Sequence, residues 1–283
     1  MRWEGGRKSD NVEDYRGSRF GGGGLKLGIG GTLIALVAAY FFGIDPRVIL
    51  GLAQSGGGSG PDQPPQLGTP DDRAGQFVSV VLADTEDTWT AIFKANGREY
   101  VPPKLDLFTS QINTGCGFAD SGVGPFYCPA DRKVYLDPSF FNELSTRFQA
   151  PGDFANAYVI AHEVGHHVQN LLGIEAKVRA AQERASEVER NQLQVRMELQ
   201  ADCYAGVWAH NADRARQIIE QGDVEAALNA ASAVGDDTIQ RRTQGHVVPD
   251  SFTHGTAKQR MTWFKRGLDS GSASNCDTFS SAN

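Results

Sequence analysis

The chain has 283 residues, of which 40% are hydrophobic, and this is enough for one substantial core with additional segments. Its 34 acidic residues outnumber its 27 basic ones, and the formal net charge of −7 argues against a nucleic-acid-binding protein. No internal repeat is visible in the sequence.

The first distinctive segment, residues 27–44, is apolar and carries no charge. Eighteen such residues are at the lower limit of what spans a bilayer. Six Lys and Arg residues precede the segment, whereas Arg47 alone follows it before Arg73. The positive-inside rule therefore predicts a transmembrane anchor, with residues 1–26 in the cytoplasm and the following domain outside the cell.

A cleaved signal peptide and a buried core helix are the alternatives for residues 27–44. The charged region ahead of the segment is long for a signal peptide, and Gly-rich flanks on both sides argue for separation from a domain. Residues 45–75 are rich in Gly and Pro, which predicts a flexible linker. The folded domain is then expected over residues 76–283.

The elements at the start of this domain are short. Residues 77–82 are typical either of a strand or of a helix start, and residues 84–89 of a helix start. Residues 100–108 look extended, and residues 133–137 form the clearest strand of the domain, ending at Pro138 before a short helix.

The next predicted helix carries the first chemical motif. Asp153 is a suitable N-cap, Gly173 is a natural stop, and the residues between them provide a broad apolar surface. Within this helix His162 and His166 are one turn apart in an H-E-x-x-H motif, so they project from the same face. Two such imidazoles can bind one Zn²⁺, while Glu163, roughly 100° around the helix, can reach a water beside the metal.

About thirty residues later, Glu198 and Asp202 repeat the four-residue spacing on a second predicted helix. One of them can be the third ligand, and the other can accept the far N–H of a ligand histidine. Three protein ligands with an open fourth position are typical of a catalytic zinc site. Zinc is inferred from ligand type, since such sites also accept Co²⁺ or Mn²⁺. A solvated helix face is the alternative, and the apolar residues after Asp202 argue against it.

H-E-x-x-H followed by E-x-x-x-D resembles the gluzincin peptidases, and the whole chain resembles the bacterial neutral zinc metallopeptidase family. The similar stretches are residues 1–9, 162–169, 198–206, 254–256 and 259–260. The resemblance implies that His162, His166 and Glu198 bind one zinc ion. It also implies that Glu163 is the catalytic base and that Asp202 orients His162.

The spacing from His254 to Arg260 is similar to a downstream His-x5-Arg element of membrane gluzincins. This implies that His254 stabilises the oxyanion of the reaction, whereas on sequence alone an ordinary loop histidine is an equal alternative. His167 follows His166 directly and points about 100° away, so it is expected on the flank of the helix. His210 and His246 lack a ligand-spaced partner and are assigned no role.

The expected fold class is α+β: a helix-dominated zincin-like metallopeptidase domain with a small sheet, preceded by one N-terminal transmembrane helix. In gluzincin-like folds, an edge strand upstream of the active helix pairs with extended substrate. Residues 134–136 are the candidate for this edge, with a plain core strand as an equal alternative.

The four cysteines all lie on the predicted outer side, where an even number favours disulfides with three possible pairings. Cys116–Cys128 would close a Gly-rich loop, and Cys203–Cys276 would pin the C-terminal tail against the Glu198 helix. This pairing is favoured, with free buried cysteines as the alternative.

The predicted function is that of a zinc endopeptidase held in the bacterial cell membrane by residues 27–44, with its catalytic domain outside the cytoplasm and a peptide or protein as substrate. A catalytically latent zinc-binding scaffold on the same fold is the main alternative, against which the intact Glu163 argues. A cytosolic hydrolase and an intramembrane protease are weaker alternatives. The second would need its metal motif inside a membrane span, and the apolar segment lies far from His162.

Overall fold

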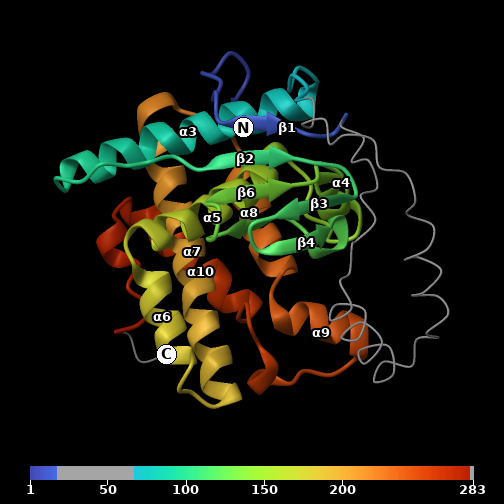
Figure 1. Ribbon diagram of the computed structural model, residues 1–283, viewed down its shortest axis with the longest axis vertical. Coiled ribbons are helices and arrows are strands. Elements are labelled where there is room, and N and C mark those ends of the chain that lie inside the picture. The colour runs from blue at the N-terminus through green and yellow to red at the C-terminus, as the bar shows by residue number, and fades with distance from the viewer. Residues whose placement is uncertain (18–66, 281–283) are drawn as a thin grey trace, which may run out of the picture. The chain divides into compact units, whose positions relative to one another are not determined.

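The structure, a computed structural model, describes residues 1–17 and 67–280 (Figure 1). Residues Met1–Arg16 belong to the same compact unit as the chain from Thr69 onward. The described helices are α3 (Arg73–Ala95), α4 (Ser139–Thr146), α5 (Asp153–Leu171), α6 (Ile174–Gln182), α7 (Glu187–Arg216), α8 (Asp223–Ala233), α9 (Asp236–Gln244) and α10 (Ala257–Ser270). The described strands are β1 (Val12–Asp14), β2 (Lys104–Leu107), β3 (Gln111–Thr114), β4 (Gly117–Asp120), β5 (Phe126–Cys128) and β6 (Lys133–Leu136).

Four of these strands form one sheet in the order β1-β2-β6-β5. β1, β2 and β6 are parallel, and β5 runs antiparallel to β6. The strand predicted from residues 133–137 is therefore an interior strand, so the core-strand alternative holds and residues 134–136 are not the edge. The edge nearest α5, the helix with the H-E-x-x-H motif, is β5, which packs against α5.

The two faces of this sheet are covered differently. Leu105 and Val134 belong to the main core, which the helices complete. On the other face, Tyr135 packs with residues of the β3–β4 hairpin in a separate small core. The predicted Cys116–Cys128 disulfide is present and joins the hairpin to β5.

Residues 77–82 lie inside α3, a single helix of 23 residues, so the helix alternative for this segment is correct. Asp72 begins the helix by accepting a hydrogen bond from the Gly75 N–H at 2.8 Å. Valines are typical of strands, but here Val78 and Val81 are fully buried on the helix face that packs against the core. Tertiary burial therefore outweighs the local preference of the segment.

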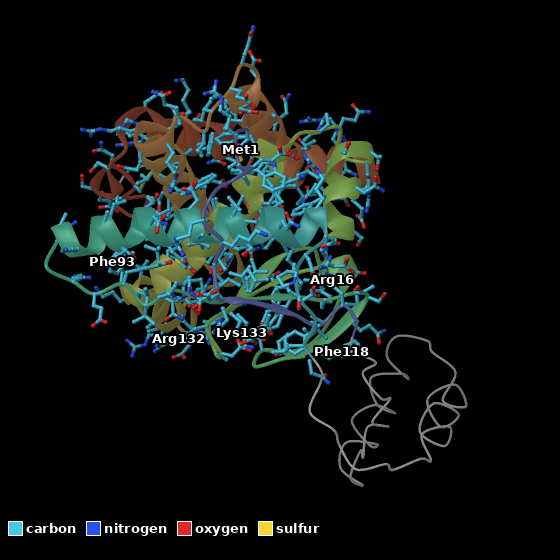
Figure 2. The ribbon with its side chains drawn as sticks, turned by 90° about the horizontal axis from the view of Figure 1, so that it is seen from above. Met1, Arg16, Phe93, Phe118, Arg132 and Lys133 are labelled. Atoms are coloured by element: carbon cyan, nitrogen blue, oxygen red, sulfur yellow. A yellow bond between two sulfur atoms is a disulfide. The ribbon has the colours of Figure 1, made fainter. Side chains whose placement is uncertain are left out.

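Residues 1–16 are built into the domain. In Figure 2 this segment crosses α3 and then runs as β1 beside the sheet. Trp3 is 7% exposed and packs edge-on against Phe77 at 5.4 Å between ring centroids. The Ser9 N–H donates to the carbonyl of Ser79 at 3.0 Å, and β1 then pairs with β2.

The expected membrane topology is corrected by these contacts. A segment that shares a core and a sheet with the domain cannot lie on the opposite side of a membrane, so a cytoplasmic N-terminus with an extracytoplasmic catalytic domain is wrong. Among residues 1–17 and 67–280, no helix combines the length and apolar character needed to cross a bilayer. The predicted anchor, residues 27–44, and most of the predicted linker lie outside the described residues.

Helix α7 packs against both α5 and α10, and Figure 1 shows α7 and α10 below the sheet. A Cβ atom on Gly165, within the H-E-x-x-H motif, would lie 3.0 Å from the carbonyl oxygen of Ala201 on α7. One on Gly206 would lie 2.1 Å from the carbonyl oxygen of Phe264 on α10. Glycine at position 165 therefore lets α5 approach α7, which brings the two motifs of the sequence together, and glycine at position 206 lets α10 approach α7.

Candidate functional site

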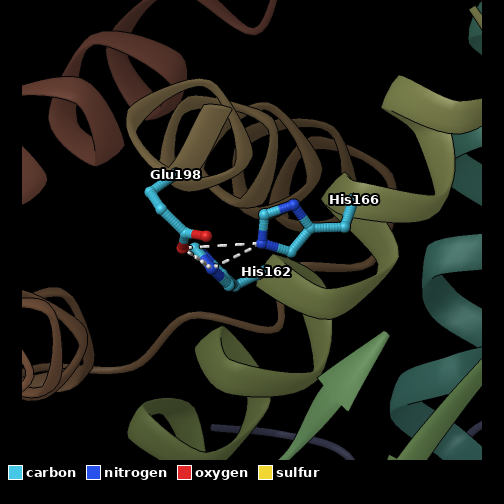
Figure 3. Close-up of side chains that lie close together, drawn as sticks. All are labelled: His162, His166 and Glu198. Carbon is cyan, nitrogen blue, oxygen red and sulfur yellow. Dashed lines mark hydrogen bonds and ion pairs between the residues drawn. The ribbon is translucent and has the colours of Figure 1, made fainter. Parts of the chain in front are cut away.

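The two predicted metal-binding motifs meet between α5 and α7 (Figure 3). The Nε2 atoms of His162 and His166 are 3.2 Å apart. Glu198 places its Oε2 atom 3.2 Å from Nε2 of His162 and 3.6 Å from Nε2 of His166. Three possible ligand atoms, from two turns of α5 and one of α7, therefore face the same point.

These distances fit a zinc ion. Ligand atoms bonded to a tetrahedral zinc at about 2.0–2.2 Å lie about 3.3–3.6 Å from one another. The three measured separations, 3.2, 3.2 and 3.6 Å, are at or near this range. Two imidazoles and one carboxylate are also a ligand set that catalytic zinc sites use. Among the described residues, these three form the one group of His, Cys, Asp or Glu side chains that could hold a metal ion.

Asp202, which the family resemblance implied as the partner of His162, lies behind that side chain. Its Oδ1 atom is 2.8 Å from Nδ1 of His162, so the imidazole donates there and keeps its Nε2 lone pair for a metal. Arg260, which is 4% exposed, donates to both oxygens of Asp202 at 2.8 and 2.9 Å. Burial raises the pKa of Asp202, but the charges of Arg260 and His162 outweigh burial and lower it to about 2. The carboxylate of Asp202 is therefore charged at neutral pH. Its hydrogen bond from Nδ1 orients the His162 imidazole.

Sequence reasoning missed several residues that hold this site. Tyr158, one turn before His162, donates to Asp202 Oδ1 at 2.6 Å. Gln194, one turn before Glu198, donates to Glu198 Oε1 at 3.0 Å and leaves Oε2 facing the histidines. The one-turn spacings were available in the sequence, but Tyr and Gln at such positions form no known ligand pattern.

Glu163 is not one of the three converging groups. Its side chain lines the same cavity of about 620 Å³ as His162, His166 and Glu198. Burial raises the pKa of Glu163, and the neighbouring histidines oppose this rise. A carboxylate with a raised pKa is better matched to accepting a proton near neutral pH than an exposed one.

His254 lies on the loop before α10 and lines this cavity as well. Its Nδ1 atom is 3.2 Å from Oδ1 of Asp236, the first residue of α9. The other oxygen of Asp236 accepts backbone N–H bonds from residues 253, 254 and 255, so this carboxylate fixes the whole loop. The hydrogen bond to Asp236 raises the pKa of His254, although burial lowers it. Asp236 was missed because it lies 18 residues before His254 with no spacing signal.

His167, which was assigned no role from the sequence, connects α5 to neighbouring segments by two hydrogen bonds. It is fully buried on α5, donates from Nε2 to the carbonyl of Val101 at 2.7 Å, and accepts from the Tyr127 hydroxyl at 3.0 Å. Burial lowers the pKa of His167 to about 4. A neutral imidazole therefore fastens β5, which contains Tyr127, to the helix that carries the metal-binding histidines.

The second predicted disulfide, Cys203–Cys276, is also present and ties the C-terminal tail to α7. The structure thus brings every sequence-predicted site residue into one region. Five of them line the cavity, and Asp202 lies fully buried behind His162.

Comparison with known proteins also points to a zinc metallopeptidase. The sequence model of a family described as "Putative neutral zinc metallopeptidase" matches residues 1–279. "Uncharacterized protein YpfJ" of Escherichia coli (strain K12) is 51% identical over 287 residues, which cover 99% of each chain. "Uncharacterized protein Rv2575" of Mycobacterium tuberculosis (strain H37Rv) is 44% identical over 219 residues, which cover 74% of this chain and 73% of its own. No solved structure matches the chain. With a family match over nearly its whole length and a His/His/Glu group between α5 and α7, the chain belongs to the neutral zinc metallopeptidase family.

Proposed function

We propose that the protein is a zinc-dependent endopeptidase in which His162, His166 and Glu198 bind the metal. One observation carries the proposal. Three ligand atoms converge at 3.2–3.6 Å, while a fourth side chain, the carboxylate of Glu163, lies in the same cavity outside the ligand set. A purely structural metal site has no need for a free carboxylate beside it.

Each of these residues has a separate role in peptide hydrolysis. Bound zinc supplies Lewis-acid activation of water and of the scissile carbonyl. Glu163 accepts the proton of the attacking water and transfers it to the leaving amine. His254, which Asp236 holds in place, donates a hydrogen bond to the oxygen that gains charge. Asp202 and Gln194 keep His162 and Glu198 in position.

The substrate is proposed to bind as an extended peptide along β5. This strand pairs with β6 on one side and is an edge of the four-stranded sheet. Phe126 and Tyr127 of β5 line the same cavity as Glu163. An edge strand beside a reactive group can add a peptide by main-chain hydrogen bonds, with side-chain pockets giving selectivity.

Part of the cavity lining is apolar. It includes Val159, one turn before Glu163, and the pair Phe140 and Phe148, whose ring centroids are 6.3 Å apart. A pocket of this composition favours a large apolar side chain close to the scissile bond.

The test uses the full chain as wild type and as Glu163→Gln. Metal content is measured by mass spectrometry, and cleavage of a fluorogenic peptide library is followed with and without a chelator. Zinc near one equivalent in both proteins, with cleavage by the wild type alone, is the expected result. Glu187→Gln, at the exposed start of α7, is the matched control and should cleave as the wild type does.

Two outcomes would contradict the proposal. Zinc in both proteins but cleavage in neither would favour a zinc-binding scaffold on a peptidase fold. Absence of zinc from the wild type would contradict the assignment of the metal ligands themselves.

A further inference from the structure

A line of buried amide hydrogen bonds connects His166 to the C-terminal tail. Nδ1 of His166 is 2.9 Å from Oε1 of Gln169, whose Nε2 is 3.1 Å from Oε1 of Gln200. Nε2 of Gln200 in turn lies 2.9 Å from the main-chain carbonyl oxygen of Cys276. Gln169 is fully buried and Gln200 is 4% exposed, so water does not substitute for these contacts.

The carbonyl oxygen of Cys276 determines which atom donates and which accepts in every hydrogen bond of this line. A main-chain carbonyl can only accept, so Gln200 must present its NH₂ group to Cys276 and its oxygen to Gln169. Gln169 then donates to that oxygen and to the carbonyl of Met197 at 2.7 Å, which leaves its own oxygen facing His166. His166 must therefore carry its proton on Nδ1 and direct the Nε2 lone pair at the metal position.

The carbonyl at the end of the line is held in place covalently. Cys276 forms the disulfide with Cys203, which follows Gln200 by three residues on α7. The Thr278 hydroxyl adds a hydrogen bond of 2.7 Å to the carbonyl of Arg196. The tail is thus pinned to α7 on both sides of the carbonyl that Gln200 requires.

We propose that Gln169 and Gln200 are positioning residues for the metal, and that the Cys203–Cys276 disulfide increases zinc affinity through them. The inference rests on the metal ligands of the proposed function but not on peptide cleavage. Loss of the disulfide frees the Cys276 carbonyl, Gln200 loses its fixed orientation, and the acceptor for His166 Nδ1–H becomes mobile.

The test measures zinc affinity of the full chain by competition with a chromophoric chelator. Gln169→Met should weaken zinc binding by about 10–100-fold, the range for loss of a hydrogen-bond partner of a metal ligand. Gln200→Met and the double variant Cys203→Ala/Cys276→Ala act one step further away, so each should weaken it by about tenfold, at the low end of that range. In the cobalt-substituted protein, the visible absorption bands should shift in all three, since they report ligand orientation.

Combining the substitutions tests whether the disulfide acts on the metal site through Gln200. If the disulfide acts through Gln200, adding Gln200→Met to the double cysteine variant should produce no further loss of affinity, whereas independent effects would multiply. Unfolding temperatures are recorded for each variant, and affinities are compared where all are folded. If Gln169→Met does not fold, the comparison of Gln200→Met with the cysteine variants still shows whether the disulfide affects zinc affinity through Gln200.

Two control variants remove a side-chain hydrogen bond and a disulfide that are not connected to His166. Asn211→Leu removes a 2.9 Å hydrogen bond to the carbonyl of Gly271 at the start of the tail, and Cys116→Ala/Cys128→Ala removes the hairpin disulfide. Both should retain wild-type zinc affinity and cobalt spectra. Wild-type affinity in Gln200→Met and in Cys203→Ala/Cys276→Ala would overturn the inference, and so would equal losses in the two controls.

The two proposals fail in different ways. A wild-type protein that binds zinc but cleaves no peptide contradicts the proposed function, and the affinity series still decides the role of Gln169 and Gln200. A wild-type protein that binds no zinc overturns both.

Discussion

The indole N–H of Trp3 donates a 2.8 Å hydrogen bond to the carboxylate of Asp153, the first residue of α5. The N-terminal segment is thereby fixed to the beginning of the helix that carries both histidines of the proposed metal site. This explains why Asp153 is the first helical residue and not the N-cap that the sequence predicted, because its side chain faces Trp3 and Gly152 takes the cap position.

The N-terminal segment is therefore expected to be essential for stability. A chain that begins at residue 67 lacks β1 and Trp3, and loss of a buried Trp side chain alone costs about 3–5 kcal/mol. We expect this chain to unfold at a much lower temperature and to bind less zinc. The matched control keeps residues 1–17 and replaces residues 18–66 by a short Gly-Ser linker, which is feasible because Arg16 and Asp72 are hydrogen-bonded at 2.8 Å. Wild-type stability of the chain from residue 67 would contradict this.

Asp202 and Arg260 are expected to show separable effects on stability and on metal binding. Asp202→Asn leaves Arg260 buried without a charged partner and should destabilise the fold by about 3–5 kcal/mol. Adding Arg260→Met removes the unpaired charge and should restore much of the stability. Zinc affinity should stay about 10–100-fold low in both variants, because the acceptor for His162 is weakened. Urea unfolding and chelator competition measure the two quantities, and parallel recovery of both would contradict a positioning role for Asp202.

His254 is expected to act in catalysis and not in metal binding. His254→Gln should keep wild-type zinc content but lose about 100–1,000-fold in kcat. If protonated His254 is the active form, activity falls as the pH rises through its pKa. Asp236→Asn removes the hydrogen bond that raises this pKa, so the alkaline fall should move to lower pH. The pH–rate profiles of wild type and Asp236→Asn decide this, and identical alkaline limbs would count against the role of Asp236.

His167 predicts a specific acid sensitivity. Its pKa is lowered to about 4 in the folded protein by burial, against about 6.5 in an unfolded chain. A lowered pKa means that the unfolded state gains the proton first, so this contribution to stability is complete above pH 6.5 and is lost as the pH falls towards 4. The difference amounts to about 3 kcal/mol. The free energy of unfolding of metal-free His167→Gln should fall less over this range than that of the metal-free wild type. Equal slopes would show that His167 does not titrate in this way.

The apolar part of the cavity lining predicts substrate preference. Val159→Trp should fill the space beside Glu163 and reduce kcat/KM for peptides with a large apolar side chain next to the scissile bond. Peptides with Gly or Ala at that position should be affected far less, and zinc content should not change. Steady-state kinetics on paired peptides measure this ratio, and a uniform loss for all peptides would contradict a selective pocket.

The parts of the site that could be predicted from the sequence are those that depend on helical periodicity. His162 with His166 and Glu198 with Asp202 each lie four residues apart, and a helix places such pairs on one face whatever surrounds it. Both disulfides were favoured correctly because four cysteines allow few pairings, and Cys203 and Cys276 join a motif helix to the tail.

The parts that could not be predicted depend on contacts between distant segments. β5 is the edge strand because β6 pairs with β2 on its other side, and no local pattern encodes that order. Gln169 and Gln200 are ordinary helix residues in the sequence, and their alignment with Cys276 follows from how α5, α7 and the tail pack. The charge distribution around residues 27–44 led to an incorrect topology because it carries no information that Trp3 is part of the core.

The contact between Arg2 and Ile218, which follows α7, also has a consequence for synthesis. The backbone N–H of Arg2 donates to the carbonyl of Ile218 at 2.8 Å, so the N-terminal segment binds a part of the chain that is synthesised more than 200 residues later. At about 5–20 residues per second, this delay lasts on the order of 10–40 s. During that time the N-terminal segment lacks its contact with Ile218, and until Asp153 has been made the indole of Trp3 also lacks its hydrogen-bond partner. A nascent chain that pauses before α8 is therefore expected to depend on chaperones until its N-terminal segment can dock.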